Sequence, residues 1–338
     1  MNILVTGGAG YIGSHTIIEL FEQGYTRIFS IDNYLNSKES NYEKIEKITG
    51  KTPEYNNIDL TDLESTRAFF KVNKIDAIIH FAALKSVPES VENSEVYYRN
   101  NTLTLLNLLS CMKEFDVKHI IFSSSCSVYG NPDQLPVNES TPFGVAESPY
   151  ASTKQMGETI LKDFCKTNVN FTAISLRYFN PVGAHSSGLI GENFSRRPNN
   201  LIPIITQTAA KIREKITVFG TDYNTDDGSC IRDYIHVIDI AKAHVKALDY
   251  QKQLNTTNNY DVFNLGTGRG TSVLEIIHSF EEISGKKLNY TLGDRRAGDV
   301  ETIYSDNAKA SSTLKWNASL SLEEMLKSAW KWQQSMEA

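Results

Sequence analysis

Short apolar runs alternate with longer amphipathic segments through the first half of the chain. Continuous apolar runs of this length are typical of strands buried on both faces, and apolar positions three or four residues apart are typical of helices. We expect strands at residues 1–6, 27–31, within 51–59, 75–81, 119–122 and 171–176, and helices at 14–23, 63–72 and 96–115. Strands separated by helices predict an α/β fold with a Rossmann-type doubly wound parallel sheet, which binds ligands at the carboxyl ends of its strands.

The second half of the chain has a different pattern, in which loops predominate from Pro181 onward. The same criteria predict helices at residues 201–211, 238–248 and 273–284, and strands at 217–219, 262–266 and 288–292. We expect the apolar run at 262–266 to return to the main sheet. The remaining elements predict a smaller, mixed C-terminal lobe.

A glycine-rich turn, residues 7–13, lies between the first expected strand and the first expected helix. Such a turn lets backbone N–H groups approach a phosphate, and the helix N-terminus favours negative charge. Asp32 ends the next strand, nineteen residues after Gly13, near the spacing of about 20 at which an acid accepts hydrogen bonds from the adenosine ribose. Because a carboxylate repels a 2′-phosphate, the sequence predicts NAD rather than NADP.

These assignments predict two domains. The NAD-binding domain would comprise residues 1–180 plus about 233–266, and the substrate-binding lobe residues 181–232 plus about 267–338.

Tyr150 and Lys154 are the strongest candidates for chemistry. Pro149 suits the first turn of a helix, and in that helix the i,i+4 spacing places both side chains on one face. A nearby ammonium would lower the pKa of the phenol from about 10 towards neutrality, which would make Tyr150 a proton-transfer group. The spacing is equally compatible with an ordinary surface pair.

The bulk composition excludes several functional classes. The 338 residues carry a net charge of −6, which argues against a nucleic-acid binder. The four cysteines are scattered and the seven histidines do not cluster, so neither a disulfide framework nor a metal site is indicated. No apolar run is long enough to cross a membrane. We therefore expect no membrane association and a cytoplasmic location.

Arginines are concentrated in the loops of the second half, although the whole chain is acidic. Guanidinium groups suit phosphate oxygens because they donate two parallel hydrogen bonds and stay charged. The group predicts a second phosphorylated ligand opposite the dinucleotide, and consists of Arg196, Arg197, Arg232, Arg295 and Arg296.

With these residues in place, the chain resembles the extended short-chain dehydrogenase/reductases over essentially its full length, and within them the UDP-glucose (UDP-galactose) 4-epimerases. The motifs shared with the whole superfamily are residues 6–15, 80–83, 122–125, 128–130 and the Tyr150-x-x-x-Lys154 pair. The more specific ones are residues 176–185, 198–201, 227–228, 232–237 and 295–299.

The resemblance implies a chemistry for the pair. Tyr150 would take the proton of the sugar 4-hydroxyl while NAD accepts the hydride of carbon 4, and Ser125 would hydrogen-bond the reacting oxygen. Lys154 would bind the nicotinamide ribose and lower the tyrosine pKa. The 4-keto sugar would then rotate and receive the hydride on its other face, which interconverts UDP-glucose and UDP-galactose.

The resemblance also implies two sets of binding residues besides the catalytic Ser125, Tyr150 and Lys154, and no metal ligand. The cofactor set, which includes those three, adds Gly7, Gly10, Tyr11, Ile12, Gly13, Asp32, Asn33, Asn36, Ser37, Asp59, Leu60, Phe81, Ala82, Ala83, Lys85, Asn100, Tyr178 and Phe179. The UDP-hexose set shares four residues with the cofactor set, namely Lys85, Ser125, Tyr150 and Phe179. Its other members are Asn180, Asn200, Leu201, Phe219, Arg232, Arg296, Asp299 and Ile303. A homodimer through helices at 96–115 and 150–166 is implied as well.

Three departures from family patterns bear on specificity. Ser125-Cys126-Ser127 replaces the Thr-Asp-Glu of related dehydratases, so dehydration is not expected. Ile303 stands where enzymes restricted to UDP-glucose and UDP-galactose have a tyrosine, which predicts room for an N-acetyl group unless isoleucine simply packs in the core. The loop at 193–197 also departs from the usual sequence, which leaves its substrate contacts open.

Two other functions stay open at this point. One is a different NAD-dependent oxidoreductase or decarboxylase acting on a nucleotide sugar. The other is a non-catalytic dinucleotide-sensing module, which would have no need of the complete Ser125, Tyr150 and Lys154 set.

Overall fold

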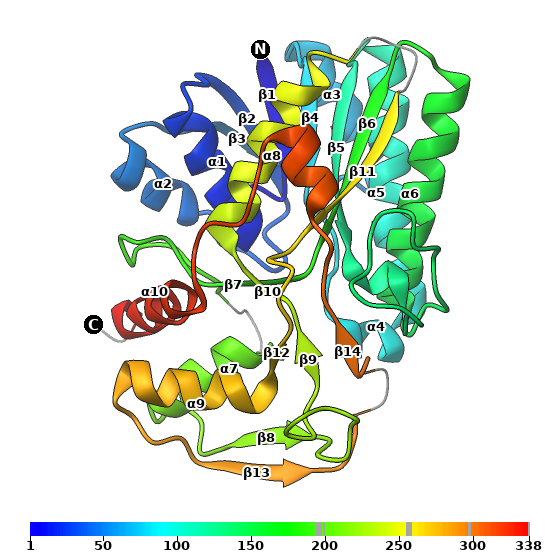
Figure 1. The fold of residues 1–338 in the computed structure, drawn as a ribbon. Coiled ribbons are helices and arrows are strands. Elements are labelled where there is room, and N and C mark those ends of the chain that lie inside the picture. Colours follow the sequence, from blue (N-terminus) through cyan, green and yellow to red (C-terminus); the bar gives the residue numbers. More distant parts are fainter. Residues whose placement is uncertain (194–197, 199, 255–258, 297–298, 337–338) are drawn as a thin grey trace.

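The structure, a computed structural model, describes residues 1–193, 198, 200–254, 259–296 and 299–336. Within these residues seven strands form one parallel sheet in the order β11-β6-β5-β4-β1-β2-β3 (Figure 1). The strands are β1 (Asn2–Thr6), β2 (Arg27–Asp32), β3 (Glu54–Asn57), β4 (Ala77–His80), β5 (His119–Ser125), β6 (Thr172–Tyr178) and β11 (Tyr260–Leu265). The order reverses between β1 and β4, and such a switch point is where doubly wound sheets bind ligands.

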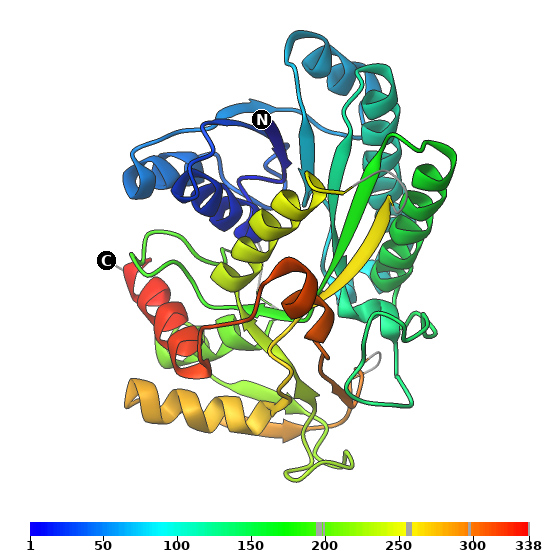
Figure 2. The same ribbon diagram turned by 45° about the horizontal axis from the view of Figure 1, so that its top comes forward.

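Helices cover both faces of this sheet (Figure 2). One face carries α1 (Tyr11–Glu22), α2 (Asn41–Thr49) and α8 (Val237–Gln251), and the other carries α3 (Leu63–Val72), α5 (Ser94–Glu114) and α6 (Pro149–Thr167). The sequence of the central strand β1 is continuously apolar because both of its faces are buried. Ile3 and Val5 belong to the core under α1 and α8, whereas Leu4 belongs to the core under α3 and α5, because successive strand residues point to opposite faces.

The remaining elements form a smaller lobe below the carboxyl ends of the strands in Figure 1. It contains α7 (Leu201–Ala209), α9 (Val273–Ser284) and α10 (Leu322–Ser335). Its short strands are β8 (Ile216–Phe219) with β13 (Tyr290–Gly293), and β9 (Ile231–Arg232) between β12 (Thr271–Ser272) and β14 (Thr302–Ile303). Strands β7 (Asn180–Val182) and β10 (Tyr234–His236) form a separate parallel pair, and the short helix α4 (Val87–Glu92) follows β4 and precedes α5.

Most predicted elements are present, and three helices were not predicted. Helices at 63–72 and 273–284 have the predicted bounds, and the run at 262–266 joins the main sheet as β11 beside β6. Helices α2, α4 and α10 were missed, although α10 has a sequence signal in the capping box of Ser321 and Glu324. The two-domain division stays a prediction.

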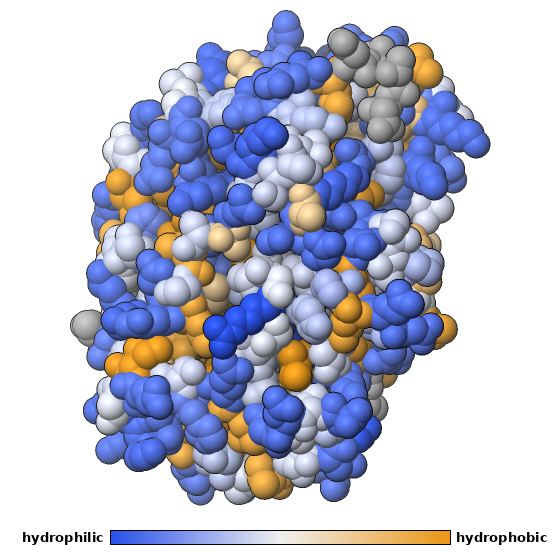
Figure 3. All heavy atoms as spheres, in the orientation of Figure 1, coloured by the Kyte–Doolittle hydropathy of each residue, from blue (hydrophilic) through white to orange (hydrophobic). Residues whose placement is uncertain are grey.

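The surface carries mostly hydrophilic residues with apolar ones in small groups, as the face in Figure 3 shows. Within the described part of the chain, no helix combines the length and the apolar character needed to span a bilayer.

Candidate active site

The glycine turn after β1 makes a close approach that side chains would prevent. A Cβ on Gly7 would lie 2.8 Å from the backbone nitrogen of Ala82, which follows β4, and one on Gly13 would lie 2.3 Å from the Gly7 carbonyl oxygen. Helix α1 begins beyond this turn with Gly10 as its N-cap, without a side-chain cap and without an acidic residue in its first turn. Its first N–H groups and its dipole are therefore suited to a phosphate, as the dinucleotide prediction requires.

Asp32 lies beside this turn at the end of β2. Its carboxylate accepts hydrogen bonds from the Ala9 nitrogen at 3.1 Å, the Tyr34 nitrogen at 2.9 Å and the Ser37 hydroxyl at 2.7 Å. Burial raises the pKa of Asp32, and these hydrogen bonds oppose that shift. The carboxylate thus lies where the predicted adenosine ribose would be held.

Other predicted cofactor residues follow neighbouring strands. Asp59 accepts from Asn33 at 3.3 Å, and the hydroxyl of Tyr178 contacts His244 Nε2 at 2.6 Å. The rest of this set lies in the turns after β2, β3, β4 and β6 or in α5, and consists of Asn36, Leu60, Phe81, Ala83, Lys85, Asn100 and Phe179, with Tyr11 and Ile12 opening α1.

Helix α6 places Lys154 in the interior and leaves Tyr150 half-buried. Ser148 caps the helix by accepting from the Ala151 nitrogen at 3.2 Å, and Pro149 occupies its first turn. Lys154 is only 4% exposed, and its ammonium donates to the carbonyl oxygen of Ser123 at 2.6 Å. The ammonium lies 5.7 Å from the centre of the Tyr150 ring. The alternative of an ordinary surface pair is therefore wrong.

The expected direction of the Tyr150 pKa is also wrong for this arrangement. Burial raises the pKa of Tyr150 to about 12, and a hydrogen bond with Ser125 opposes the shift. Burial lowers the pKa of Lys154 to about 8, and the nearby Glu158 opposes that shift. Loss of hydration is the largest cause of both shifts.

Two of the five predicted arginines lie together in the structure. Arg296 forms a two-pronged contact with Asp299 at 3.2 and 2.6 Å and lies 5.5 Å from the centre of the Phe219 ring. Arg232 lies 4.0 Å from the same carboxylate. Arg295 instead contacts Asp222 at 2.7 Å, so it belongs to another cluster. Arg196 and Arg197, with most of the loop at 193–197, lie outside the described residues.

Ile303 adjoins this cluster. It pairs with Arg232 across β14 and β9, is 3% exposed, and packs in a small core with Phe179, Tyr129 and Val128. Asn180 lies at the start of β7, where its backbone N–H donates to the carbonyl oxygen of Asp233, the residue after Arg232.

The predictions missed a buried carboxylate, Glu192, which joins the two sets of residues. Its Oε1 accepts from Lys85 Nζ at 2.9 Å and from Asn200 Nδ2 at 2.8 Å, next to Leu201 at the start of α7. Lys85 and Glu192 are 107 positions apart, so no local pattern connects them.

The comparisons with known proteins agree with this geometry. The family model described as the NAD dependent epimerase/dehydratase family matches residues 3–266. The chain belongs to this family.

Individual relatives match over nearly the whole chain. The UDP-glucose 4-epimerase of Bacillus subtilis (strain 168) is 48% identical over 335 residues, which cover 99% of this chain and 97% of that protein. The UDP-glucose 4-epimerase of Drosophila melanogaster is 46% identical over 337 residues, covering 98% and 96%. The crystal structure of UDP-glucose 4-epimerase from Bifidobacterium longum in complex with NAD+ and UDP has a TM-score of 0.95 at 44% identity, covering 99% of this chain and 98% of that one.

Within this family framework, the site combines a glycine turn suited to a dinucleotide, a half-buried phenol beside a buried ammonium, and an arginine cluster. Among the described residues, no group of histidine, cysteine and acidic side chains could hold a metal ion. The Tyr150 phenol hydrogen-bonds Ser125, and its ring centre lies 5.7 Å from the Lys154 ammonium.

We predict that Lys154→Met stabilises the NAD-free protein. A lysine whose pKa falls from 10.5 to about 8 on folding destabilises the fold fully below pH 8, and this cost disappears as the pH rises above 10.5. The variant should therefore gain about 1–3 kcal/mol in free energy of unfolding at pH 7. Urea unfolding at pH 7, 9 and 10.5 measures the gain, which should shrink along that series. A variant less stable than wild type at pH 7 would contradict the assigned burial cost.

Proposed function

We propose that this chain is a UDP-glucose 4-epimerase that interconverts UDP-glucose and UDP-galactose through a transient 4-keto sugar. NAD is the cofactor and, when bound, supplies the hydride acceptor and donor. The observation that carries the proposal is the set of Ser125, Tyr150 and Lys154 at the end of β5 and the start of α6, with Lys154 buried, together with the cluster of Arg232 and Arg296 in the smaller lobe.

Tyr150 would remove and return the proton of the sugar 4-hydroxyl. Its phenol needs help to ionise, because burial raises its pKa to about 12. Ser125 can donate to the phenolate oxygen, and Lys154 supplies a positive charge on the same helix face. The same hydroxyl of Tyr150 can serve both directions of the reaction, since the proton that it takes in one half it gives back in the other.

The arginine cluster would keep the ketone bound while the sugar turns. Arg232 and Arg296 offer guanidinium groups to a diphosphate, and Phe219 offers a ring that is 41% exposed. Asn180, Asn200, Leu201 and Asp299 would complete the nucleotide contacts. Anchoring the nucleotide leaves the hexose free to present either face.

The chemistry at Cys126 and Ser127 supports epimerisation over dehydration. Burial raises the pKa of the Cys126 thiol to about 12, and a serine hydroxyl does not ionise near neutral pH. Neither side chain can act as the acid and base that removal of water needs. Net oxidation or decarboxylation would instead accumulate NADH or release carbon dioxide.

We predict that the purified protein converts UDP-galactose to UDP-glucose without net NADH formation. Tyr150→Phe should lower kcat by about 10²–10⁴-fold, the usual contribution of a positioned acid–base group. Tyr290→Phe, in the remote strand β13, is the matched control and should keep wild-type activity. Product analysis by chromatography measures both. An inactive wild type would refute the epimerase assignment, and an active Tyr150→Phe would refute the role of Tyr150 alone.

We propose further that Ile303 lets the site accept N-acetylated sugars. Isoleucine is shorter than tyrosine, and Ile303 lies beside Phe179 and Arg232, next to both ligand sets. Ile303→Tyr should lower kcat/KM for UDP-N-acetylglucosamine at least about tenfold relative to UDP-glucose, because added bulk discriminates by collision. Ile303→Val is the control and should retain both substrates. A wild type that leaves UDP-N-acetylglucosamine unchanged would show that the wall is closed by other residues.

A homodimer through α5 and α6 is also proposed. The two helices lie side by side (Figure 2) and expose apolar residues, with Val96 at 53%, Leu106 at 42% and Met156 at 40%. Leu106→Glu would place charge in the buried interface and should convert dimer to monomer in sedimentation equilibrium. Leu292→Glu, at a 60% exposed position on β13, should leave the mass unchanged. A monomeric wild type would refute the dimer.

Two further proposals concern the cellular location and the division into domains. A cytoplasmic location is supported by four free cysteines, Cys111, Cys126, Cys165 and Cys230, since disulfides are rare in reducing compartments. The proposed division keeps residues 1–180 plus about 233–266 for NAD and residues 181–232 plus about 267–338 for the UDP-sugar.

A further inference from the structure

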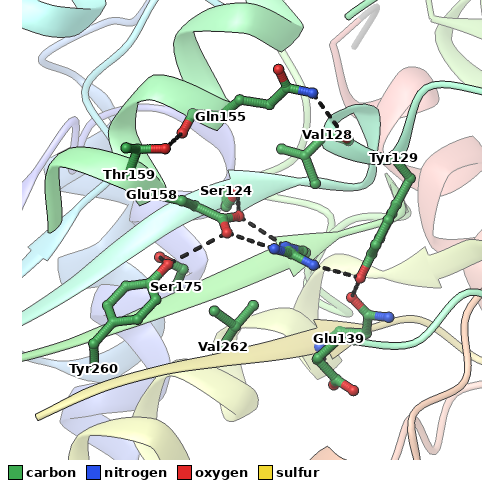
Figure 4. Close-up of polar contacts among 12 residues, drawn as sticks. Ser124, Val128, Tyr129, Glu139, Gln155, Glu158, Thr159, Ser175, Tyr260 and Val262 are labelled. Carbon is green, nitrogen blue, oxygen red and sulfur yellow. Dashed lines mark hydrogen bonds and ion pairs between the residues drawn. The ribbon is translucent and has the colours of Figure 1, made fainter. Parts of the chain in front are cut away.

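Helix α6 carries a third polar side chain on the face of Tyr150 and Lys154. Glu158 follows Lys154 by four residues and is 2% exposed. Each of the three contacts one residue at the end of β5, within 123–125. Tyr150 hydrogen-bonds the Ser125 side chain, and Lys154 donates to the Ser123 carbonyl oxygen. Glu158 accepts from the Ser124 hydroxyl (Figure 4). Three successive turns of α6 are thus anchored to one short segment at the end of β5.

Glu158 is held in place by a buried arginine on the next strand. Arg177 of β6 is 4% exposed and grips both carboxylate oxygens, with Nε 2.9 Å from Oε1 and Nη2 2.7 Å from Oε2. The third nitrogen of Arg177 donates to the Tyr129 hydroxyl at 2.8 Å. Tyr260 from β11 approaches Glu158 Oε2 at 3.4 Å (Figure 4). Both charged groups of this ion pair therefore have hydrogen-bond partners, and the pair favours a single position of α6 on the sheet.

Glu158 also acts on the charge of Lys154. Its negative charge raises the pKa of Lys154 against the effect of burial. The other groups around this ammonium are Tyr150 on α6, the Phe122 ring on β5 at 4.9 Å, and His80 on β4. Burial and the Lys154 charge hold the pKa of His80 at about 3, so His80 is neutral. Glu158 is therefore the negative group that favours the charged lysine.

We propose that Glu158, held by Arg177, is a positioning residue that anchors α6 at the end of β5 and provides a negative charge near Lys154 and Tyr150. This role rests on the proposed epimerase function. Glu158 has no contact with substrate in it, because its carboxylate is enclosed by Ser124, Arg177 and Tyr260. Its effect should appear in turnover and its pH dependence rather than in substrate binding.

The test is Glu158→Gln in the holoenzyme, assayed with UDP-galactose from pH 6 to 10. Glutamine keeps the shape and an acceptor for Ser124 but removes the charge. We expect kcat to fall about tenfold, less than the loss of the acid–base group itself, with KM within about twofold of wild type. The basic limb of the kcat profile should move to lower pH by about half a unit, because Lys154 then loses its proton more easily.

A second variant separates positioning from folding. Glu158→Gln leaves the Arg177 charge unpaired and so can unfold the protein, whereas Glu158→Gln with Arg177→Met removes both charges and should regain thermal stability. If that double variant regains wild-type kcat and its basic limb, the pair is merely structural and the proposal is overturned. Low kcat with a displaced limb supports it. Tyr260→Phe, which removes a long contact on the far side of Glu158, should change neither quantity.

Failure of this role differs visibly from failure of the epimerase function. A wild type that does not convert UDP-galactose overturns the function and this role with it. An active wild type with an unchanged kcat and limb in Glu158→Gln overturns the positioning role alone.

Discussion

The site depends on how closely helix α6 lies against the end of strand β5. Gly157 makes this approach possible, because a Cβ there would lie 2.5 Å from the ring of Phe122. The same ring lies 4.9 Å from the Lys154 ammonium. A larger residue at 157 would push the helix away and pull the lysine from the Ser123 carbonyl. The depth at which Lys154 and Tyr150 lie, and therefore their shifted pKa values, follows from this contact.

Burial of these ionisable groups removes their hydration and so lowers the stability of the folded protein. A lysine with a pKa near 8 loses its proton more easily than an exposed lysine, whereas a tyrosine with a pKa near 12 loses its proton less easily than an exposed tyrosine. A water-poor site strengthens every remaining interaction, so a single hydrogen bond from Ser125 or a charge from Lys154 acts strongly on the phenol. The buried ion pair of Glu158 and Arg177 extends the same principle one turn further along α6.

The two halves of the molecule divide the work in space. The main sheet holds the glycine turn after β1, Asp32 at the end of β2, and α6 against β5 and β6. The smaller lobe brings Arg232, Arg296 and Asp299 together from segments more than sixty positions apart. Glu192 connects the two sides, since it contacts Lys85 after β4 and Asn200 at the start of α7.

The sequence by itself determined the alternation of strands and helices, the glycine turn with Asp32, and the placement of Tyr150 and Lys154 on one helix face, because these depend on neighbours a few residues apart. Only the tertiary structure decided the depth of burial, which reversed the expected shift of the Tyr150 pKa. It also separated Arg295 from Arg296 and revealed Glu192 and the Glu158–Arg177 pair. Desolvation and long-range charge contacts depend on what packs around a group, and no local spacing records that packing.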